Sequence, residues 1–145
     1  MSPLPFAVFL VRLTIGGLLV VAGFLKLRAP VAFATEIANY QLFPSVAPYV
    51  AATLPLVEIL IGAGLILFPR PWRRAAEAVA LGLTVVFASA VGSAYARRID
   101  IDCGCFGTGG GAINGLTLLR NVALVAATVF LLRFDRGRAT SRRPQ

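Results

Sequence analysis

Residues 47–68 read APYVAATLPLVEILIGAGLILF, and Glu58 is the one charged residue among them. The sequence PRPWRR follows directly at 69–74. An apolar run of about 20 residues is long enough to cross the hydrocarbon core of a bilayer as a helix. Prolines end such a helix, and tryptophan and arginine favour the membrane–water interface. The sequence therefore predicts a membrane-spanning helix here, followed by a tight turn at the interface.

Three further apolar runs lie on either side of this one. The first is too long for a signal peptide and contains Arg12, so we expect it to be retained as a helix. The connection at 29–49 holds three prolines and several aromatic residues, which indicates an interfacial segment with a short amphipathic helix. We predict an all-α integral membrane four-helix bundle, a single domain at 1–134, with helices at about 4–26, 47–68, 75–97 and 113–133. The remaining residues, 135–145, are predicted to form a disordered basic tail.

The composition supports a multi-pass protein of the inner or plasma membrane. The 145 residues are 58% hydrophobic and 14% charged, whereas soluble domains are roughly half apolar and a quarter charged. The net charge of +8 comes from arginines at the edges of apolar runs and near the C-terminus, with no basic face interleaved with aromatic residues. This distribution argues against a nucleic-acid partner and for a lipid bilayer.

Basic residues also predict the orientation. With four crossings, one side of the membrane carries eight of them: Arg70, Arg73, Arg74, Arg133, Arg136, Arg138, Arg142 and Arg143. The other side carries four: Lys26, Arg28, Arg97 and Arg98. Because cytoplasmic loops are enriched in Lys and Arg, we expect both termini in the cytoplasm. The loop at 97–112, between the third and fourth helices, then lies outside the cytoplasm.

That loop contains both cysteines of the chain, in the sequence DCGCFG at 102–107. Cys103 and Cys105 are close enough in sequence to reach the upper part of the Cα separation that a disulfide tolerates. A ring this small is strained, which makes the bond labile, and Gly104 permits the tight backbone. Disulfides also persist on the oxidising side of a membrane. The pattern therefore favours thiol–disulfide exchange.

Three other roles remain open for these cysteines. A metal site needs about four ligands, and the loop adds only Asp100 and Asp102, so we expect no metal. A static disulfide is a second possibility, although closing so short a loop removes little chain entropy. Two inert thiols are the third.

Three charged residues interrupt the apolar runs near mid-membrane: Arg12, Glu58 and Arg120. Charges at that depth normally face the bundle interior and pair, so we predict an Arg12–Glu58–Arg120 cluster. This cluster either fixes helix register or stabilises an anion such as a reduced quinone or a thiolate. Asn121, Thr117 and Thr53 are expected to supply nearby hydrogen bonds, while Glu36 and Glu77 are interpreted as solvated helix ends. A row of small residues at every fourth position of the third run indicates close helix contact: Ala76, Ala80, Thr84, Ala88, Gly92 and Ala96.

Four motifs together resemble the methylamine-utilisation MauE family of small four-helix membrane proteins, which is related to the DoxX-like group. They are AGFLKL at 22–27, LPLVE at 54–58, DCGCFG at 102–107 and LRN at 119–121, and the resemblance covers about residues 10–130. It implies a role in maturing exported proteins with an extracytoplasmic thioredoxin-like partner. The family's named member serves the disulfide-rich small subunit of methylamine dehydrogenase. A more distant resemblance is to vitamin K epoxide reductase-type enzymes, which use Cys–x–x–Cys and a second cysteine pair that this chain lacks.

We therefore expect a membrane thiol–disulfide redox protein that exchanges electrons between a thioredoxin-like partner and a quinone while an exported client matures. The expected catalytic residues are Cys103, Cys105, Glu58 and Arg120. The expected residues for a quinone or another anion are Arg12, Arg120, Asn121 and Phe106. The alternative is a non-catalytic membrane scaffold or chaperone in which the two cysteines form a static disulfide. Small-ion transport is disfavoured, because the apolar runs include no paired broken segments.

Overall fold

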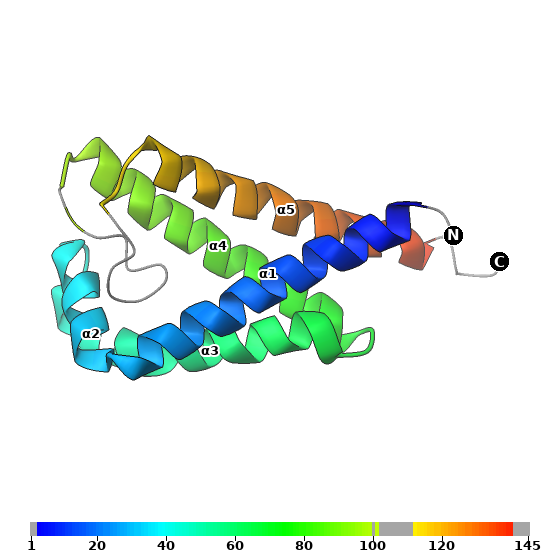
Figure 1. Ribbon diagram of the computed structural model, residues 1–145, viewed down its shortest axis with the longest axis horizontal. Helices are drawn as coiled ribbons and strands as arrows, with labels where there is room; N and C mark the ends of the chain where they lie inside the picture. Colours follow the sequence, from blue (N-terminus) through cyan, green and yellow to red (C-terminus); the bar gives the residue numbers. More distant parts are fainter. Residues whose placement is uncertain (1–2, 100, 102–111, 141–145) are drawn as a thin grey trace.

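The computed structural model describes the backbone of residues 3–99, 101 and 112–140, and the side chains of 5–99, 101 and 112–135. Within these residues the chain is all-α. Its helices are α1 (Pro3–Arg28), α2 (Pro30–Asn39), the short 3-10 helix η1 (Pro44–Val46), α3 (Ala47–Leu67), α4 (Trp72–Ala96) and α5 (Gly115–Thr140) (Figure 1).

Four of these helical segments are long and apolar enough to cross a membrane: Pro5–Arg28, Pro44–Leu67, Trp72–Ala96 and Gly115–Asp135. The predicted all-α fold with four apolar helices is confirmed, and this is a multi-pass membrane protein. The short helix expected within 29–49 is α2. The last helix is longer than predicted, because α5 continues to Thr140 rather than ending near 133.

The long helices form a bundle with two distinct ends (Figure 1). At one end, which we call the turn end, α1 begins, α5 ends and α3 connects to α4. At the other end, which we call the α2 end, α2 crosses the bundle and α4 leads toward α5. Helices α1 and α3 lie side by side and run in opposite directions, as do α4 and α5.

Glycines set the close contact between α1 and α3. A Cβ added at Gly62 would lie 2.5 Å from the carbonyl oxygen of Gly16, and one at Gly23 would lie 2.6 Å from that of Pro55. Only residues without a side chain permit such an approach, which is how membrane helices often pack. On α4, the small residues Ala76 and Ala80 are buried, so the first half of the predicted row does face the bundle.

Two hydrogen bonds to backbone carbonyl oxygens connect the segments at the α2 end. Arg97, directly after α4, donates a side-chain hydrogen bond to the carbonyl oxygen of Tyr40, directly after α2, at 2.6 Å. The amide of Ile113 donates to the carbonyl oxygen of Ile101 at 3.1 Å. The described residues on either side of 102–111 are therefore held together at this end of the bundle.

Candidate functional site

A buried ion pair joins α1 to α3. Lys26 Nζ lies 2.5 Å from Glu58 Oε1, and both side chains are only 1% exposed. The Cα–Cβ bond of a helical residue tilts toward the N-terminus of its helix. Because α1 and α3 are antiparallel, Lys26 leans into the bundle and Glu58 leans toward the α2 end. The two side chains therefore converge although Lys26 lies in the last turn of α1 and Glu58 near the middle of α3.

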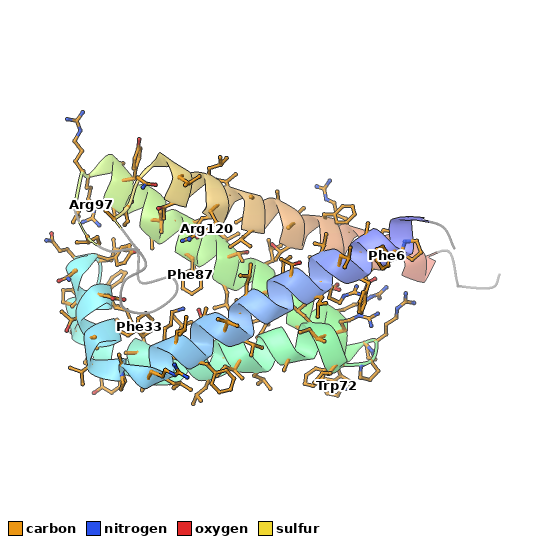
Figure 2. All side chains as sticks on the ribbon, in the orientation of Figure 1. Phe6, Phe33, Trp72, Phe87, Arg97 and Arg120 are labelled. Carbon is orange, nitrogen blue, oxygen red and sulfur yellow. The ribbon has the colours of Figure 1, made fainter. Side chains whose placement is uncertain are left out.

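Aromatic rings surround the lysine nitrogen. Lys26 Nζ lies 5.2 Å from the ring centroid of Phe33 on α2 and 5.2 Å from that of Phe87 on α4. Figure 2 labels both rings, and the distances are within the range of cation–π interactions. Lys26 thus contacts α2, α3 and α4. Its ammonium group lies at the centre of a buried polar site in an otherwise apolar region.

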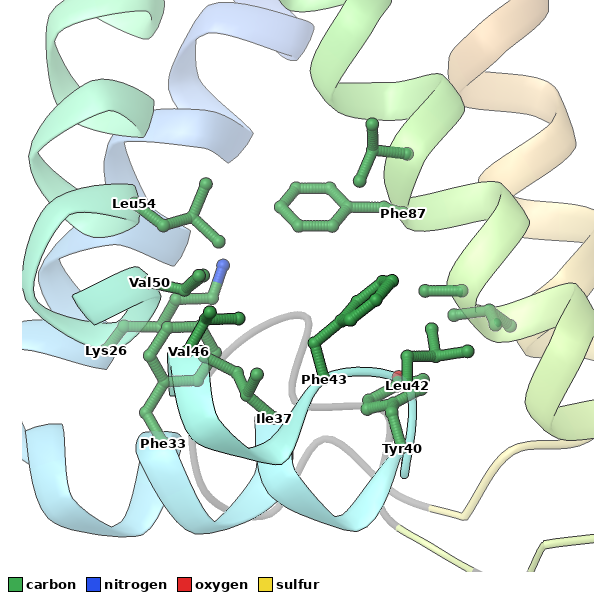
Figure 3. A pocket seen from close by; sticks show the side chains of 13 residues that line it. Lys26, Phe33, Ile37, Tyr40, Leu42, Phe43, Val46, Val50, Leu54 and Phe87 are labelled. Carbon is green, nitrogen blue, oxygen red and sulfur yellow. The ribbon is translucent and has the colours of Figure 1, made fainter. Parts of the chain in front are cut away.

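A cavity of about 200 Å³ opens beside Lys26 at the α2 end. We call it the Lys26 cavity; Figure 3 shows the lysine extending into it with its nitrogen toward Phe87. Its walls come from α1, α2, the segment after α2, α3 and α4: Lys26, Phe33, Ile37, Tyr40, Leu42, Phe43, Val46, Val50, Leu54, Val86, Phe87, Ala90 and Val91. Among the described residues that line the cavity, Lys26 is the one charged residue, so its ammonium group provides a strong hydrogen-bond donor beside largely apolar walls.

A second, smaller cavity of about 40 Å³ lies on the other side of Phe87 and Glu58. We call it the Arg120 cavity, since Arg120 and Asn121 of α5 also line it. The side-chain amide of Asn121 donates to the carbonyl oxygen of Thr117 at 2.8 Å. Glu58 Oε2 is buried and has no hydrogen-bond partner among the described residues. A water needs roughly 10–15 Å³ and polar partners, so this cavity has the size and lining to hold water against Glu58.

A separate polar cluster lies at the turn end. Arg12 Nη2 lies 3.1 Å from Glu77 Oε1 and 3.3 Å from Asp135 Oδ2. Arg73 Nε lies 3.5 Å from the same Asp135 oxygen, and Arg74 donates to the Asp135 backbone carbonyl. Both carboxylates are buried. Through these contacts the cluster connects α1, α4 and α5.

The predicted Arg12–Glu58–Arg120 cluster is therefore wrong in its Arg12 member. The contact between Gly16 and Gly62 places Arg12 roughly two helical turns along the bundle from Glu58, and its side chain leans toward the turn end. Glu58 pairs with Lys26 instead, while Arg120 shares the smaller cavity with Glu58.

Two lesser predictions also need correction. Glu77 is not a solvated helix end but a buried partner of Arg12. Thr53 is exposed, and its hydroxyl donates to the carbonyl oxygen of Tyr49 on its own helix. Thr117 is buried, and its backbone carbonyl oxygen accepts the hydrogen bond from Asn121.

The comparison with known proteins decides the family. The family model described as methylamine utilisation protein MauE matches residues 4–134. This chain belongs to the MauE family. It is similar to the methylamine utilization protein MauE of Paracoccus denitrificans, with 36% identity over 125 residues. The alignment covers 84% of this chain and 66% of that relative, just under two thirds of the relative's length. No solved structure matches the chain.

Sequence reasoning missed two residues of this MauE-family bundle. Lys26 was counted among the basic residues on the outer side of the membrane, but it continues the buried face of α1 that includes Leu19 and Ala22. Asp135 was placed in the tail, but it continues the buried polar face of α5 that includes Asn121 and Thr128. In both helices the spacing of three, four or seven residues was the available signal.

The remaining predicted site residues, Cys103, Cys105 and Phe106, lie outside the described residues. Among the residues that the structure does describe, no group of three His, Cys, Asp or Glu side chains is arranged to hold a metal ion. Of the two buried polar clusters, the Lys26–Glu58 pair is the one that lies beside both the Lys26 cavity and the Arg120 cavity.

Proposed function

We propose that this MauE-family protein is a membrane thiol–disulfide redox protein that supports the maturation of exported proteins in methylamine utilisation. One observation carries the proposal. The segment that contains Cys103 and Cys105 starts and ends at the α2 end of the bundle, where Ile113 is hydrogen-bonded to Ile101. The Lys26 cavity lies at the same end. A redox-active cysteine loop and a polar site within the bundle would thus serve one side of the membrane.

The proposed exchange starts from the Cys103–Cys105 disulfide. A thiolate of an extracytoplasmic thioredoxin-like partner attacks one sulfur, which breaks the S–S bond and forms a mixed disulfide. The partner's second thiolate then breaks the mixed disulfide. The partner's dithiol is oxidised to a disulfide, and the chain's cysteines are reduced to two thiols. Two electrons and two protons pass from the partner to the chain.

Return of the cysteine pair to the disulfide requires a two-electron acceptor. The proposed class is a membrane-dissolved quinone, whose chemistry when bound is the uptake of two electrons and two protons. The residues present fit such a group, because the Lys26 cavity provides apolar walls and a buried ammonium group that can donate to a carbonyl oxygen. Lys26 would hold and orient it, while Glu58 fixes the position of Lys26.

The orientation belongs to the same proposal. Arg70, Arg73, Arg74 and Arg133 lie at the turn end of the bundle, or in the last turns of α5 that approach it. By the bias of basic residues toward the cytoplasm, the turn end faces the cytoplasm and the α2 end faces outward. The cysteine loop then meets its exported partner on the oxidising side.

Complementation tests the redox role against the scaffold alternative. The chain is expressed in cells that lack their own MauE protein, and the disulfide-bonded fraction of the methylamine dehydrogenase small subunit is measured by thiol-alkylation mass shift. We expect wild type and the control Ser89→Ala to restore oxidation, and Cys103→Ser/Cys105→Ser to lose it at equal membrane abundance. Equal restoration by the double serine variant would overturn the redox proposal and favour a non-catalytic scaffold.

A further inference from the structure

The size and lining of the Lys26 cavity narrow the ligands that it can take. An apolar protein cavity of 150 Å³ binds benzene, so about 200 Å³ accommodates a substituted six-membered ring. The Arg120 cavity, at about 40 Å³, is large enough for water but too small for a ring. A ring in the larger cavity would contact Phe33, Phe87 and the aliphatic residues Leu54 and Val91.

The buried lysine indicates an acceptor atom on that ligand. An ammonium group has three N–H donors, and among the described residues Lys26 makes one hydrogen bond, to Glu58 Oε1. Its nitrogen otherwise faces the two phenylalanine rings. A buried charge in the membrane is costly and usually functional. A ring that carries a carbonyl oxygen would accept a hydrogen bond from Lys26, whereas a lipid acyl chain has no atom to do so.

Access to the cavity comes from the bilayer. Val86 lies within the membrane-spanning part of α4, lines the cavity and is 63% exposed. Val46 and Leu42, which also line the cavity, are exposed as well. A ligand dissolved in lipid can therefore enter between α3 and α4 with its apolar tail still in the membrane.

We infer that the Lys26 cavity binds the ring of a lipid-soluble quinone, with Lys26 donating to one ring carbonyl and Glu58 acting as the positioning residue for Lys26. This inference rests on the proposed function for the identity of the ligand as a redox partner. The proposed quinone site therefore differs from the one expected from the sequence. Arg12 is paired with Glu77 and Asp135 at the turn end, and the cavity lined by Arg120 and Asn121 is too small for a ring.

Photolabelling of the full chain in lipid nanodiscs tests the site. The probe is an azido-1,4-benzoquinone with one isoprenoid unit, and labelled peptides are located by mass spectrometry. We expect labelling within 33–43 and 86–91 that unlabelled quinone competes away. Ala90→Phe fills the cavity and should reduce competed labelling at least tenfold, whereas the neighbouring control Ser89→Phe, on the exposed face of α4, should retain it. Labelling that Ala90→Phe leaves unchanged would overturn the inference.

A second variant isolates the lysine. Lys26→Met/Glu58→Leu removes both charges, which avoids leaving one buried charge without its partner. Quinone affinity, measured by competition against the same probe, should fall roughly tenfold or more, because a hydrogen bond from a charged donor is stronger than one between neutral groups. An unchanged affinity, or cavity labelling by a diazirine phospholipid that quinone does not compete away, contradicts the assignment and indicates a lipid-binding cavity.

Two measurements on the wild-type protein distinguish a failure of this inference from a failure of the proposed function. If Cys103 and Cys105 titrate reversibly but the quinone probe does not label the cavity, this inference fails and the proposed function stands. If the probe labels the cavity competitively but the cysteines do not titrate, the proposed function fails and the quinone site stands.

Discussion

Removing one partner of the Lys26–Glu58 pair should destabilise the bundle far more than removing both. In Lys26→Met, the Glu58 carboxylate keeps its buried position, at 1% exposure, without the ammonium 2.5 Å away. Breaking a buried ion pair from one side costs about 3–5 kcal/mol. Insertion of a lone charge at the centre of a membrane helix costs a similar amount, about 2.5–3.5 kcal/mol. We therefore expect Lys26→Met and Glu58→Leu each to lower the free energy of unfolding by about 3 kcal/mol or more.

The double variant tests whether an unpaired buried charge causes the loss of stability in each single variant. Lys26→Met/Glu58→Leu replaces both charges by apolar side chains of similar size, which is often neutral or stabilising. It should lie within about 1 kcal/mol of wild type, well above either single variant. Arg28→Met, which removes an exposed cation two residues further along the chain, should change stability by less than about 0.5 kcal/mol.

The assay is steric trapping or SDS-induced unfolding of the protein in bicelles, which gives a free energy of unfolding for each variant. The double-mutant cycle then yields the coupling between the two side chains. A loss of less than about 1 kcal/mol in Lys26→Met would refute the reasoning. So would a double variant whose loss equals the sum of the single losses.

The same measurement checks three smaller predictions. Gly16→Ala should lower the free energy of unfolding by about 1–3 kcal/mol, because its methyl group would lie 2.7 Å from a carbonyl oxygen of α3. The control Gly17→Ala, whose methyl group would lie in open space, should raise it by about 0.5–1 kcal/mol. Equal effects of the two variants would contradict the glycine contact. Asp135→Asn should cost about 2 kcal/mol and raise amide exchange in the last turns of α5, since its carboxylate accepts a hydrogen bond from Arg12 and forms an ion pair with Arg73. Unchanged exchange would contradict this role of Asp135. Thr84→Val should cost only about 0.6–1 kcal/mol, because it removes the 3.2 Å hydroxyl contact with Thr128 across the helices and the local 3.0 Å hydrogen bond to the carbonyl oxygen of Leu81. A larger loss of stability would contradict this estimate.

Hydropathy predicted the membrane spans well because each apolar run is long and ends at prolines or basic residues. It did not predict which charges meet. The depth of Arg12 and Glu58 was estimated from their position in each run, but antiparallel helices lean their side chains in opposite directions, which separates these two residues and brings Lys26 to Glu58. Pairing in a bundle depends on the rotation and offset of helices, and these are set by contacts such as Gly16 with Gly62.

The two buried residues that sequence reasoning missed share one cause. A lysine near the end of an apolar helix ordinarily extends to the interface. Lys26 is buried because α2 folds back across the bundle and places Phe33 over it. Asp135 lies among charged residues that resemble a solvated tail, yet Arg12 and Arg73, distant in sequence, hold it in the bundle. In both cases residues that are distant in the sequence determine whether the side chain is buried. The pattern of hydrophobic and charged residues along the sequence does not reveal these contacts.

The most direct test of the proposed function is the redox state of Cys103 and Cys105 in membranes. It is measured by thiol-alkylation mass shift across a series of glutathione and dithiothreitol buffers. The redox hypothesis predicts a reversible two-electron transition at a mild potential, well above about −300 mV. A pair that stays oxidised throughout the series, or stays reduced in air, would contradict it.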